Sequence, residues 1–251
     1  MVDTVLAMSG GLDSVVLLHH LLDQGKTVRC IGIDFGNTNS KRELQSARYF
    51  AGKLAVSLEV MGAHGLGDLV TTHGFIGALD GGDTVDPDPP GEADMLSKPP
   101  HGDPLPTGYH ITVGLTAFYA RLMNVSDVSL GLTADDIAYR PGITEYIHDF
   151  AKLIPTLETT SVDAQTRPPF KIAAEFESFT KADVIMRGLQ LGVPLEDTYS
   201  CYNGRTLHCG ICAACRGRRK AFADAGVVDP TWYEELPNVA HLKSWGLDGI
   251  G

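Results

Sequence analysis

The chain has 251 residues with a formal net charge of −11, and 43% of its residues are hydrophobic. This composition excludes a disordered or fibrous chain and is typical of a globular protein. No apolar run approaches the roughly 20 residues that span a bilayer. The first residues carry neither a basic flank nor a cleavable signal pattern. We therefore expect a cytoplasmic protein without a membrane partner.

The charge is unevenly distributed along the sequence. Seven acidic residues and a single lysine lie between positions 80 and 103, so the rest of the chain is only mildly acidic. An acidic balance disfavours a protein that coats nucleic acid, because phosphate binding needs a basic surface. We expect no stable nucleic-acid partner.

The first third of the chain predicts alternating strands and helices. Apolar runs indicate strands over 4–8, 28–35 and 55–60, and helically spaced apolar residues indicate helices over 14–23 and 40–54. Strands that alternate with helices imply βαβ units and a mostly parallel sheet.

Residues 80–106 interrupt this pattern, because this segment holds half of the 14 prolines. Such a stretch is either a functional lid or a solvated insertion, and both readings stay open. After it, the pattern predicts helices over 111–123, 144–154, 180–191 and 216–225, and strands over 125–132 and 172–176. Thr180 is expected to cap its helix.

These elements predict a Rossmann-like α/β fold, with a parallel sheet covered by helices on both faces. We assign residues 1–195 to this domain, including the proline-rich and acidic loop 80–106. Residues 196–251 form a smaller C-terminal region that contains four of the five cysteines.

A glycine pair follows the first predicted strand, in the sequence Ser9-Gly10-Gly11-Leu12-Asp13-Ser14. The N-terminus of a helix presents unpaired N–H groups and a partial positive charge, which suit an anion. Paired glycines let the backbone approach a phosphate chain closely. Asp13 would repel phosphate, so its carboxylate either accepts hydrogen bonds from backbone N–H groups or helps to hold Mg²⁺. The alternative to a phosphate loop is a plain turn with a helix cap.

This segment resembles the SGGxDS loop of the ATP pyrophosphatase superfamily, the PP-loop proteins. No lysine follows the glycines, so it is not a Walker A loop. The resemblance implies that ATP is bound by Met8, Ser9, Gly10, Gly11, Leu12, Asp13 and Ser14 and is cleaved between its α and β phosphates. It also implies a fold like that of the adenine nucleotide alpha hydrolases. Asp34 ends the second strand, where relatives meet the adenine and ribose; it is otherwise a residue that starts a loop.

The cysteines Cys201, Cys209, Cys212 and Cys215 fall within fifteen residues. In a reducing compartment such a cluster favours metal over disulfides. Four thiolates suit a closed, structural Zn²⁺ site. An iron–sulfur cluster is the alternative. His208 could replace one thiolate, although four cysteines make it more often a bystander.

Basic residues follow the cysteines, at Arg216, Arg218, Arg219 and Lys220. They could moderate the charge of four thiolates. They could also contact a phosphate or form a solvated helix face.

The two motifs together resemble the 7-cyano-7-deazaguanine (preQ0) synthase family. The resemblance rests on the PP-loop, on Ser200-Cys201-Tyr202-Asn203-Gly204 and on Cys209-Gly210-Ile211-Cys212-Ala213-Ala214-Cys215. It extends to Arg218–Thr231 and to Gly131–Asp136 with Tyr139-Arg140-Pro141, and it covers nearly the whole chain outside 80–106. Two stretches depart from the family. Residues 105–110 lack its Pro-Gly-Arg-Asn, and 36–39 replace its Gly-Gln-Arg-His.

The resemblance implies an ATP-dependent ligase that converts 7-carboxy-7-deazaguanine and ammonia to the nitrile through an adenylated carboxylate and an adenylated amide. Ser9, Asp13, Ser14 and Lys181 would act in catalysis with Mg²⁺, although Lys181 could equally be a plain exposed helix residue. Thr133, Asp135 and Arg140 would contact the substrate. Nothing resembles a glutaminase, so ammonia is free or comes from a separate protein. The family further suggests a homodimer.

Three alternatives remain beside this reading. The missing Arg-Asn stretch would fit a variant that stops at the amide or acts on a related acid. A tRNA-thiolating relative would carry an iron–sulfur cluster, but the acidic charge and the cysteine spacing disfavour it. A binding module without catalysis would not consume ATP.

Overall fold

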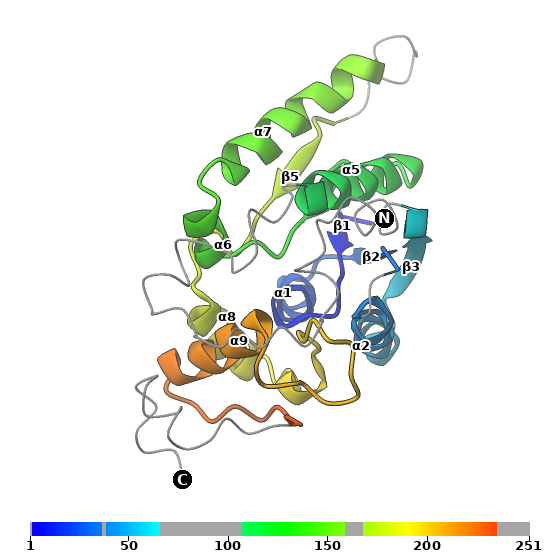
Figure 1. Cartoon of the computed structure of the whole chain (residues 1–251). Helices are drawn as coiled ribbons and strands as arrows, with labels where there is room; N and C mark the ends of the chain where they lie inside the picture. Colours follow the sequence, from blue (N-terminus) through cyan, green and yellow to red (C-terminus); the bar gives the residue numbers. More distant parts are fainter. Residues whose placement is uncertain (1, 37–38, 66–106, 159–167, 235–251) are drawn as a thin grey trace.

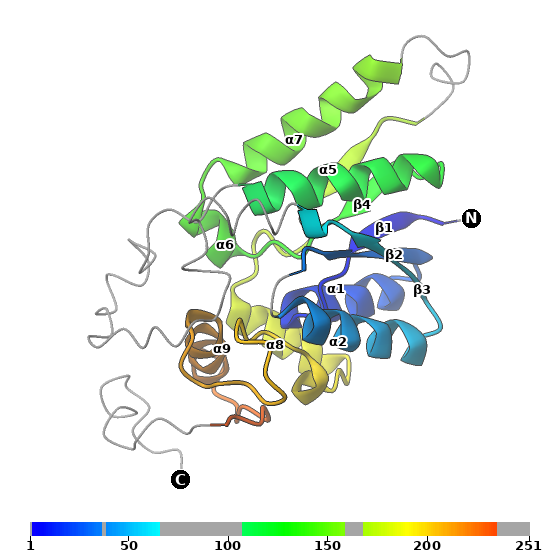
Figure 2. The same ribbon diagram turned by 45° about the vertical axis from the view of Figure 1, so that its right-hand side comes forward.

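Five parallel strands form one sheet in the part of the chain that this computed structural model describes, residues 2–36, 39–65, 107–158 and 168–234. The strands are β1 (Thr4–Ala7), β2 (Val28–Asp34), β3 (Ser57–Gly62), β4 (Asp127–Ser129) and β5 (Lys171–Ala173). Their spatial order is β3-β2-β1-β4-β5 (Figures 1 and 2). The α/β fold with a parallel sheet is thus confirmed.

Helices cover both faces of this sheet (Figures 1 and 2). The α-helices are α1 (Leu12–Asp23), α2 (Ser40–Lys53), α5 (Thr107–Leu122), α6 (Ala134–Tyr139), α7 (Ile143–Leu153), α8 (Lys181–Gln190) and α9 (Ala213–Asp224). The described residues also include two short 3₁₀ helices, η2 (Ile154–Glu158) and η4 (Leu195–Asp197). Helices α1 and α2 lie on one face, and α5 and α7 lie on the other (Figure 2).

Two apolar cores follow from the alternation of side chains along each strand. Leu6 and Cys30 point to one face and join a core built with α1, α2, α8 and α9. Val5 and Ile31 point to the other face and join a core built with α5 and α7. The continuous apolar runs of β1 and β2 therefore reflect burial on both faces, as in other parallel sheets.

The strand order reverses beside β1. The chain runs outward from β1 through β2 to β3 and then returns to place β4 on the opposite side of β1. In open α/β sheets, the crevice at such a switch point lies beyond the carboxyl ends of the strands and is where ligands bind. The loop after β1 and the loop after β4 therefore face the same crevice.

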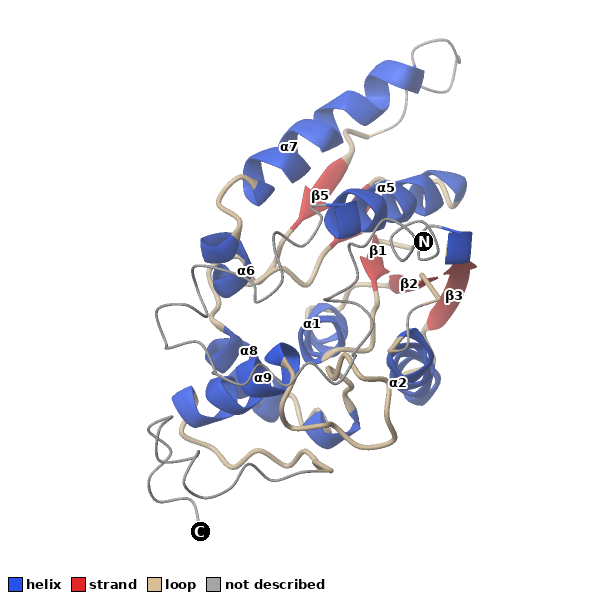
Figure 3. Cartoon of the chain, viewed as in Figure 1, coloured by secondary structure: helices blue, strands red, loops and turns tan. Residues whose placement is uncertain are grey.

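Most predicted elements are present, with shifted ends (Figure 3). Helix α1 begins at Leu12 rather than residue 14, and α9 begins at Ala213 rather than 216. The strand predicted over 55–60 covers 57–62 instead, because Ala55 adopts a left-handed φ of 54° after α2. The strand predicted over 172–176 covers only 171–173. A turn follows it, in which the N–H of Glu177 donates to the carbonyl of Ala174.

Helix α6 was not predicted, because six residues are too few to show helical spacing. Thr133 and Asp136 form the capping box that starts it. The proline-rich loop 80–106 lies outside the described residues. Among the helices that are described, none combines the length and apolarity that crossing a membrane requires.

Candidate nucleotide and metal sites

The loop after β1 gathers hydroxyl and amide groups at the start of α1. The N–H of Gly10 donates to Ser14 Oγ at 3.2 Å, and the N–H of Gly11 donates to Ser9 Oγ at 3.2 Å. The two hydroxyl oxygens lie 3.1 Å apart. Gly11 occupies the N-cap of α1 and offers no side-chain acceptor to the first turn. Such a helix start suits an anion.

Gly10 is held between α2 and the segment after η4. Its φ of +89° is a conformation that glycine adopts readily. A Cβ at this position would overlap the carbonyl oxygen of Glu43 and lie 2.7 Å from the backbone nitrogen of Ala47. The carbonyl of Gly10 accepts the Tyr199 N–H at 3.0 Å and lies 2.9 Å from the Ser46 hydroxyl. The loop conformation is therefore fixed by close packing as well as by sequence.

We expect Gly10→Ala to lower the free energy of unfolding by on the order of 3 kcal/mol, because strained backbone and overpacking each cost about 1–3 kcal/mol. Gly25→Ala is the matched control, since Gly25 has a φ of +76° but no atom within 4 Å of the position that a Cβ would take. It should cost about 1 kcal/mol. Urea denaturation measures both variants. Equal losses would show that the contact with α2 is unimportant.

Lys181 reaches Asp13 across a sequence separation of 168 residues. Its Nζ lies 2.8 Å from Asp13 Oδ2 and 3.9 Å from Asp136 Oδ2. Burial alone would lower the pKa of the Lys181 ammonium, but the two carboxylates outweigh burial and raise it. Burial raises the pKa of the Asp13 carboxyl, an effect that Lys181 opposes. The site thus holds a fixed cation beside the loop.

The second oxygen of Asp13 has no such partner. Within the described chain, Oδ1 is buried and accepts no hydrogen bond. A buried carboxylate oxygen without a donor is costly, so it indicates a missing cation or donor. Because Mg²⁺ prefers oxygen ligands, the observation fits a metal ion held beside the loop.

The segment after β4 lies against the start of α1. A Cβ on Gly131 would come within 3.3 Å of the Ser14 nitrogen, so the two backbones are in close contact. Thr133 is buried and its hydroxyl donates to Asp136 Oδ2 at 2.8 Å. Asp135 accepts the backbone N–H of Lys181 at 2.7 Å. Two of the predicted substrate residues, Thr133 and Asp135, therefore already bond within the protein.

The third predicted substrate residue, Arg140, stacks on aromatic rings. Its guanidinium carbon lies 4.9 Å from the ring centroid of Tyr109 and 5.5 Å from that of Tyr139. The pKa of the Tyr109 phenol is raised by burial and by Asp136, while Arg140 and Lys181 oppose the rise. Tyr109 is therefore within electrostatic range of the Asp13–Lys181 pair.

Asp34 lies at the end of β2, as predicted. Its carboxylate accepts the Gly36 N–H at 2.9 Å and lies 3.0 Å from His64 Nε2. Burial would raise the pKa of this group, but the bonds from His64 and Gly36 outweigh burial and lower it. The carboxylate is therefore ionised beside the crevice.

The four clustered cysteines converge in space. Their sulfur atoms all lie within 4.8 Å of one another, and Cys209 Sγ and Cys215 Sγ are 3.9 Å apart. Zn–S bonds of about 2.3 Å in a tetrahedron place sulfurs roughly 3.8 Å apart. The cluster therefore fits a four-thiolate metal site. His208 stays outside it, because His208 Nε2 accepts the Ser200 N–H at 3.1 Å.

Arg218 joins the cysteine region to the loop. It is buried, and its guanidinium donates to the Leu195 carbonyl at 2.7 Å and to the Thr198 and Thr231 hydroxyls at 2.8 and 2.7 Å. The segment it holds includes Tyr199, which donates to Gly10. A chain of contacts thus runs from α9 to the glycine loop. Of the predicted basic group, only Lys220 is plainly solvated, in a pair with Asp224.

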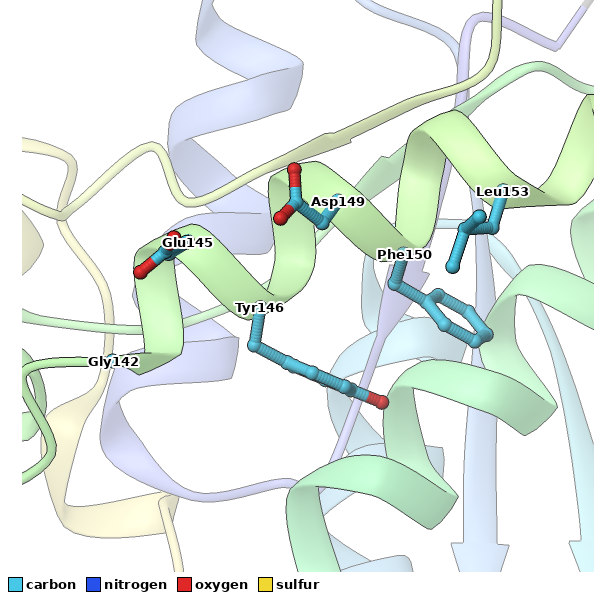
Figure 4. Close-up of a pocket in the computed structure, with 6 residues that line it drawn as sticks. All are labelled: Gly142, Glu145, Tyr146, Asp149, Phe150 and Leu153. Atoms are coloured by element: carbon cyan, nitrogen blue, oxygen red, sulfur yellow. The ribbon is translucent and has the colours of Figure 1, made fainter.

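A hollow of about 350 Å³ lies elsewhere, on α7 (Figure 4). It is lined by Gly142, Glu145, Tyr146, Asp149, Phe150 and Leu153. Tyr146 and Phe150 point from α7 towards the neighbouring helix, whereas Glu145 and Asp149 point away from it. The hollow shares no residue with the glycine loop or the cysteine cluster, so we do not assign chemistry to it.

Sequence reasoning did not single out several residues that lie around the glycine loop, namely Glu43, Ser46, Tyr109, Gly131 and Tyr199. Their proximity to the loop depends on tertiary packing and not on any local pattern. The sequence singled out Gly131 only as part of a family motif. It follows β4, which pairs with β1, so the strand order would have placed it beside the glycine loop.

The fold and the site together define a parallel α/β protein of the PP-loop class. The family model described as "Queuosine biosynthesis protein QueC" matches residues 3–226, and the chain belongs to this family.

Curated relatives agree with the family match. The chain is 30% identical over 234 residues to a 7-cyano-7-deazaguanine synthase of Desulfotalea psychrophila, covering 93% of this chain and 99% of the relative. It is 32% identical over 233 residues to the 7-cyano-7-deazaguanine synthase of Archaeoglobus fulgidus, and the match covers 92% of this chain and 90% of that relative.

Solved structures resemble the chain only distantly. The U34-tRNA thiolase NcsA of Methanococcus maripaludis matches with a TM-score of 0.44 and 14% sequence identity. The match covers all of this chain and 82% of the thiolase chain. A likeness of this size carries no assignment of function.

Proposed function

We propose that the chain converts 7-carboxy-7-deazaguanine and ammonia to 7-cyano-7-deazaguanine at the expense of ATP, as a cytoplasmic C–N ligase. The names of the curated relatives support 7-cyano-7-deazaguanine as the product. The observation that carries the proposal is the meeting of the glycine loop, the Asp13–Lys181 pair and the segment after β4 at one switch point.

The chemistry begins with an unreactive carboxylate. A carboxylate oxygen attacks the α-phosphorus of ATP, and pyrophosphate leaves. Ammonia then attacks the acyl carbon, the nitrogen loses one proton, and AMP leaves with the electrons of the C–O bond. The amide oxygen attacks the α-phosphorus of a second ATP and pyrophosphate leaves. Loss of AMP and of the two protons on nitrogen gives the nitrile.

The protein's task in this sequence is alignment and charge stabilisation. The hydroxyls of Ser9 and Ser14, together with the N-terminus of α1, would bind the phosphates. Lys181 would stabilise negative charge on the departing pyrophosphate. When bound, Mg²⁺ would supply electrostatic stabilisation of the phosphates, and the free Asp13 oxygen is the group that would hold it.

The substrate acid would lie on the β4 side of the crevice. Arg140 is the cation that would pair with its carboxylate, and the Tyr109 ring beneath Arg140 offers a flat surface to the deazaguanine ring. Thr133 and Asp135 would form the wall behind it. This placement would compensate for the absent Arg-Asn stretch.

The cysteine cluster would hold zinc and act structurally. With four thiolates a tetrahedral ion keeps no open position. The contacts of Arg218 support a role in which the metal region holds the segment that bonds to Gly10. Purified protein should be colourless with one zinc per chain, whereas a brown protein would indicate an iron–sulfur cluster.

Isotope exchange between pyrophosphate and ATP tests the first step. Exchange should require 7-carboxy-7-deazaguanine and should proceed without ammonium. Exchange that occurs equally without the acid, or with unrelated acids only, would contradict the proposed substrate. A homodimer is also part of the proposal, and sedimentation equilibrium measures it directly.

A further inference from the structure

Helices α6 and α8 begin with capping boxes of the same kind. In α6, Asp136 Oδ2 accepts the N–H of Thr133 at 3.0 Å and its hydroxyl at 2.8 Å. In α8, Asp183 Oδ2 accepts the N–H of Thr180 at 2.9 Å and its hydroxyl at 2.7 Å. Each aspartate therefore makes the same two bonds at the start of its own helix.

Asp136 differs from Asp183 in what lies outside the capping box. Asp136 Oδ2 is 3.9 Å from Lys181 Nζ, and the Asp136 side chain is only 24% exposed. Asp183 is exposed and forms no ion pair with another residue of the described ranges. Water and salt screen a partly buried pair less than a surface pair. Capping therefore accounts for Asp183 completely, but it leaves the contact of Asp136 with Lys181 unexplained.

The start of α6 also holds the backbone at the start of α8. The N–H of Lys181 donates to Asp135 Oδ2 at 2.7 Å, and the N–H of Ala134 donates to the carbonyl of Phe179 at 2.8 Å. Lys181 thus contacts two consecutive carboxylates, Asp135 through its backbone and Asp136 through its ammonium. These contacts fix Lys181 against α6 independently of the glycine loop.

Asp13 is a less constant partner for the Lys181 ammonium. Its Oδ2 lies 2.8 Å from Lys181 Nζ, but its Oδ1 is buried and has no hydrogen-bond partner in the described chain. A cation bound at Oδ1 would share the negative charge of Asp13 and weaken its attraction for Lys181. Asp136 lies outside the glycine loop, so its attraction for the ammonium would persist.

We propose that Asp136 is a positioning residue that holds the Lys181 ammonium beside the glycine loop; this inference rests on the proposed function. Asp136 acts through Lys181 and touches no reacting atom itself. The strand order makes this arrangement possible, because β4, which leads into α6, pairs with β1, which leads into the glycine loop. Asp135 supports Asp136 by fixing the first residue of α8.

A kinetic double-mutant cycle in the full-length, zinc-loaded protein tests this role. Asp136→Asn keeps an oxygen that can accept both Thr133 bonds and removes only the charge. It should lower kcat/KM for ATP in acid-dependent pyrophosphate exchange by at least about 10-fold, since a misplaced group can cost about 100-fold. In the Lys181→Met background the same substitution should cause no further loss, because residues that act through one another are not additive.

Asp183→Asn is the matched control, because it makes the same change in the capping box of α8. It should stay within about twofold of its parent in both backgrounds. Asp136→Glu keeps the charge and should retain more activity than Asp136→Asn. Urea denaturation of each variant shows whether a lower rate reflects unfolded protein.

Pyrophosphate binding measures the same contact without the acid substrate. By titration calorimetry with Mg²⁺ present, the Kd for inorganic pyrophosphate should rise for Asp136→Asn and not for Asp183→Asn. The rise should vanish in the Lys181→Met background. If the wild type shows no acid-dependent exchange while this pattern holds, the proposed substrate fails and the positioning role of Asp136 stands.

Two results would overturn the inference. An equal loss from Asp136→Asn with and without Lys181 would show that Asp136 acts independently of this lysine. Equal, small effects of Asp136→Asn and Asp183→Asn on exchange and on pyrophosphate binding would show that Asp136 only caps its helix.

Discussion

Replacing Lys181 with methionine is expected to lower kcat/KM for ATP by at least about 100-fold, the size of effect seen when one preorganised donor to a developing charge is lost. Lys181 is the cation that pairs with Asp13 beside the glycine loop. Without it, Asp13 and Asp136 would present only negative charge to the phosphates. Initial rates of pyrophosphate release measure the effect.

Two further variants separate charge from structure. The double variant Lys181→Met with Asp13→Asn removes both members of the pair, so it should recover stability without recovering activity. Lys152→Met, which removes a surface pair with Asp149, should leave the rate unchanged. Activity within threefold of the wild type for Lys181→Met would contradict the role of this cation.

Replacing Arg218 with methionine is expected to lower the free energy of unfolding by about 3–5 kcal/mol, as for other broken buried ionic networks. The guanidinium bonds to the Leu195 carbonyl and to the Thr198 and Thr231 hydroxyls, and it lies 3.9 Å from Asp229. Removing it would take the donor from the buried Thr198 and Thr231 hydroxyl oxygens, whereas the Leu195 carbonyl would still accept the Thr198 hydroxyl at 2.6 Å. Urea denaturation of the zinc-loaded protein measures the loss.

Two control variants accompany Arg218→Met, one at position 218 itself and one at Lys220 on the same helix, α9. Arg218→Lys keeps the charge but cannot form the planar fork, so its loss should be intermediate. Lys220→Met removes an exposed pair with Asp224 and should cost at most about 0.5 kcal/mol. If Arg218→Met were as stable as Lys220→Met, the link between α9 and the loop would have no energetic importance.

The sequence predicted what depends on short-range pattern. Apolar runs located the strands, and the Ser9–Ser14 segment located the loop between β1 and α1. The spacing from Cys201 to Cys215 predicted a metal cluster, and the four sulfurs do converge. Each of these features is contained within about fifteen consecutive residues.

What the sequence did not predict depends on contacts between distant segments. Lys181 was expected either at the phosphates or on a solvated face, and only the packing of α8 brings it to Asp13. Arg218 could not be distinguished from its basic neighbours, because its burial follows from the fold around it. Glu43 showed no local signal at all. Its environment depends on the contact of α2 with Gly10.

Product identification tests the central claim most directly. The purified protein would be incubated with ATP, Mg²⁺, ammonium and 7-carboxy-7-deazaguanine, and the products would be identified by mass spectrometry. We expect 7-cyano-7-deazaguanine together with AMP. The amide with AMP would show that the reaction stops halfway, and the absence of AMP from zinc-loaded protein would contradict the assigned substrate.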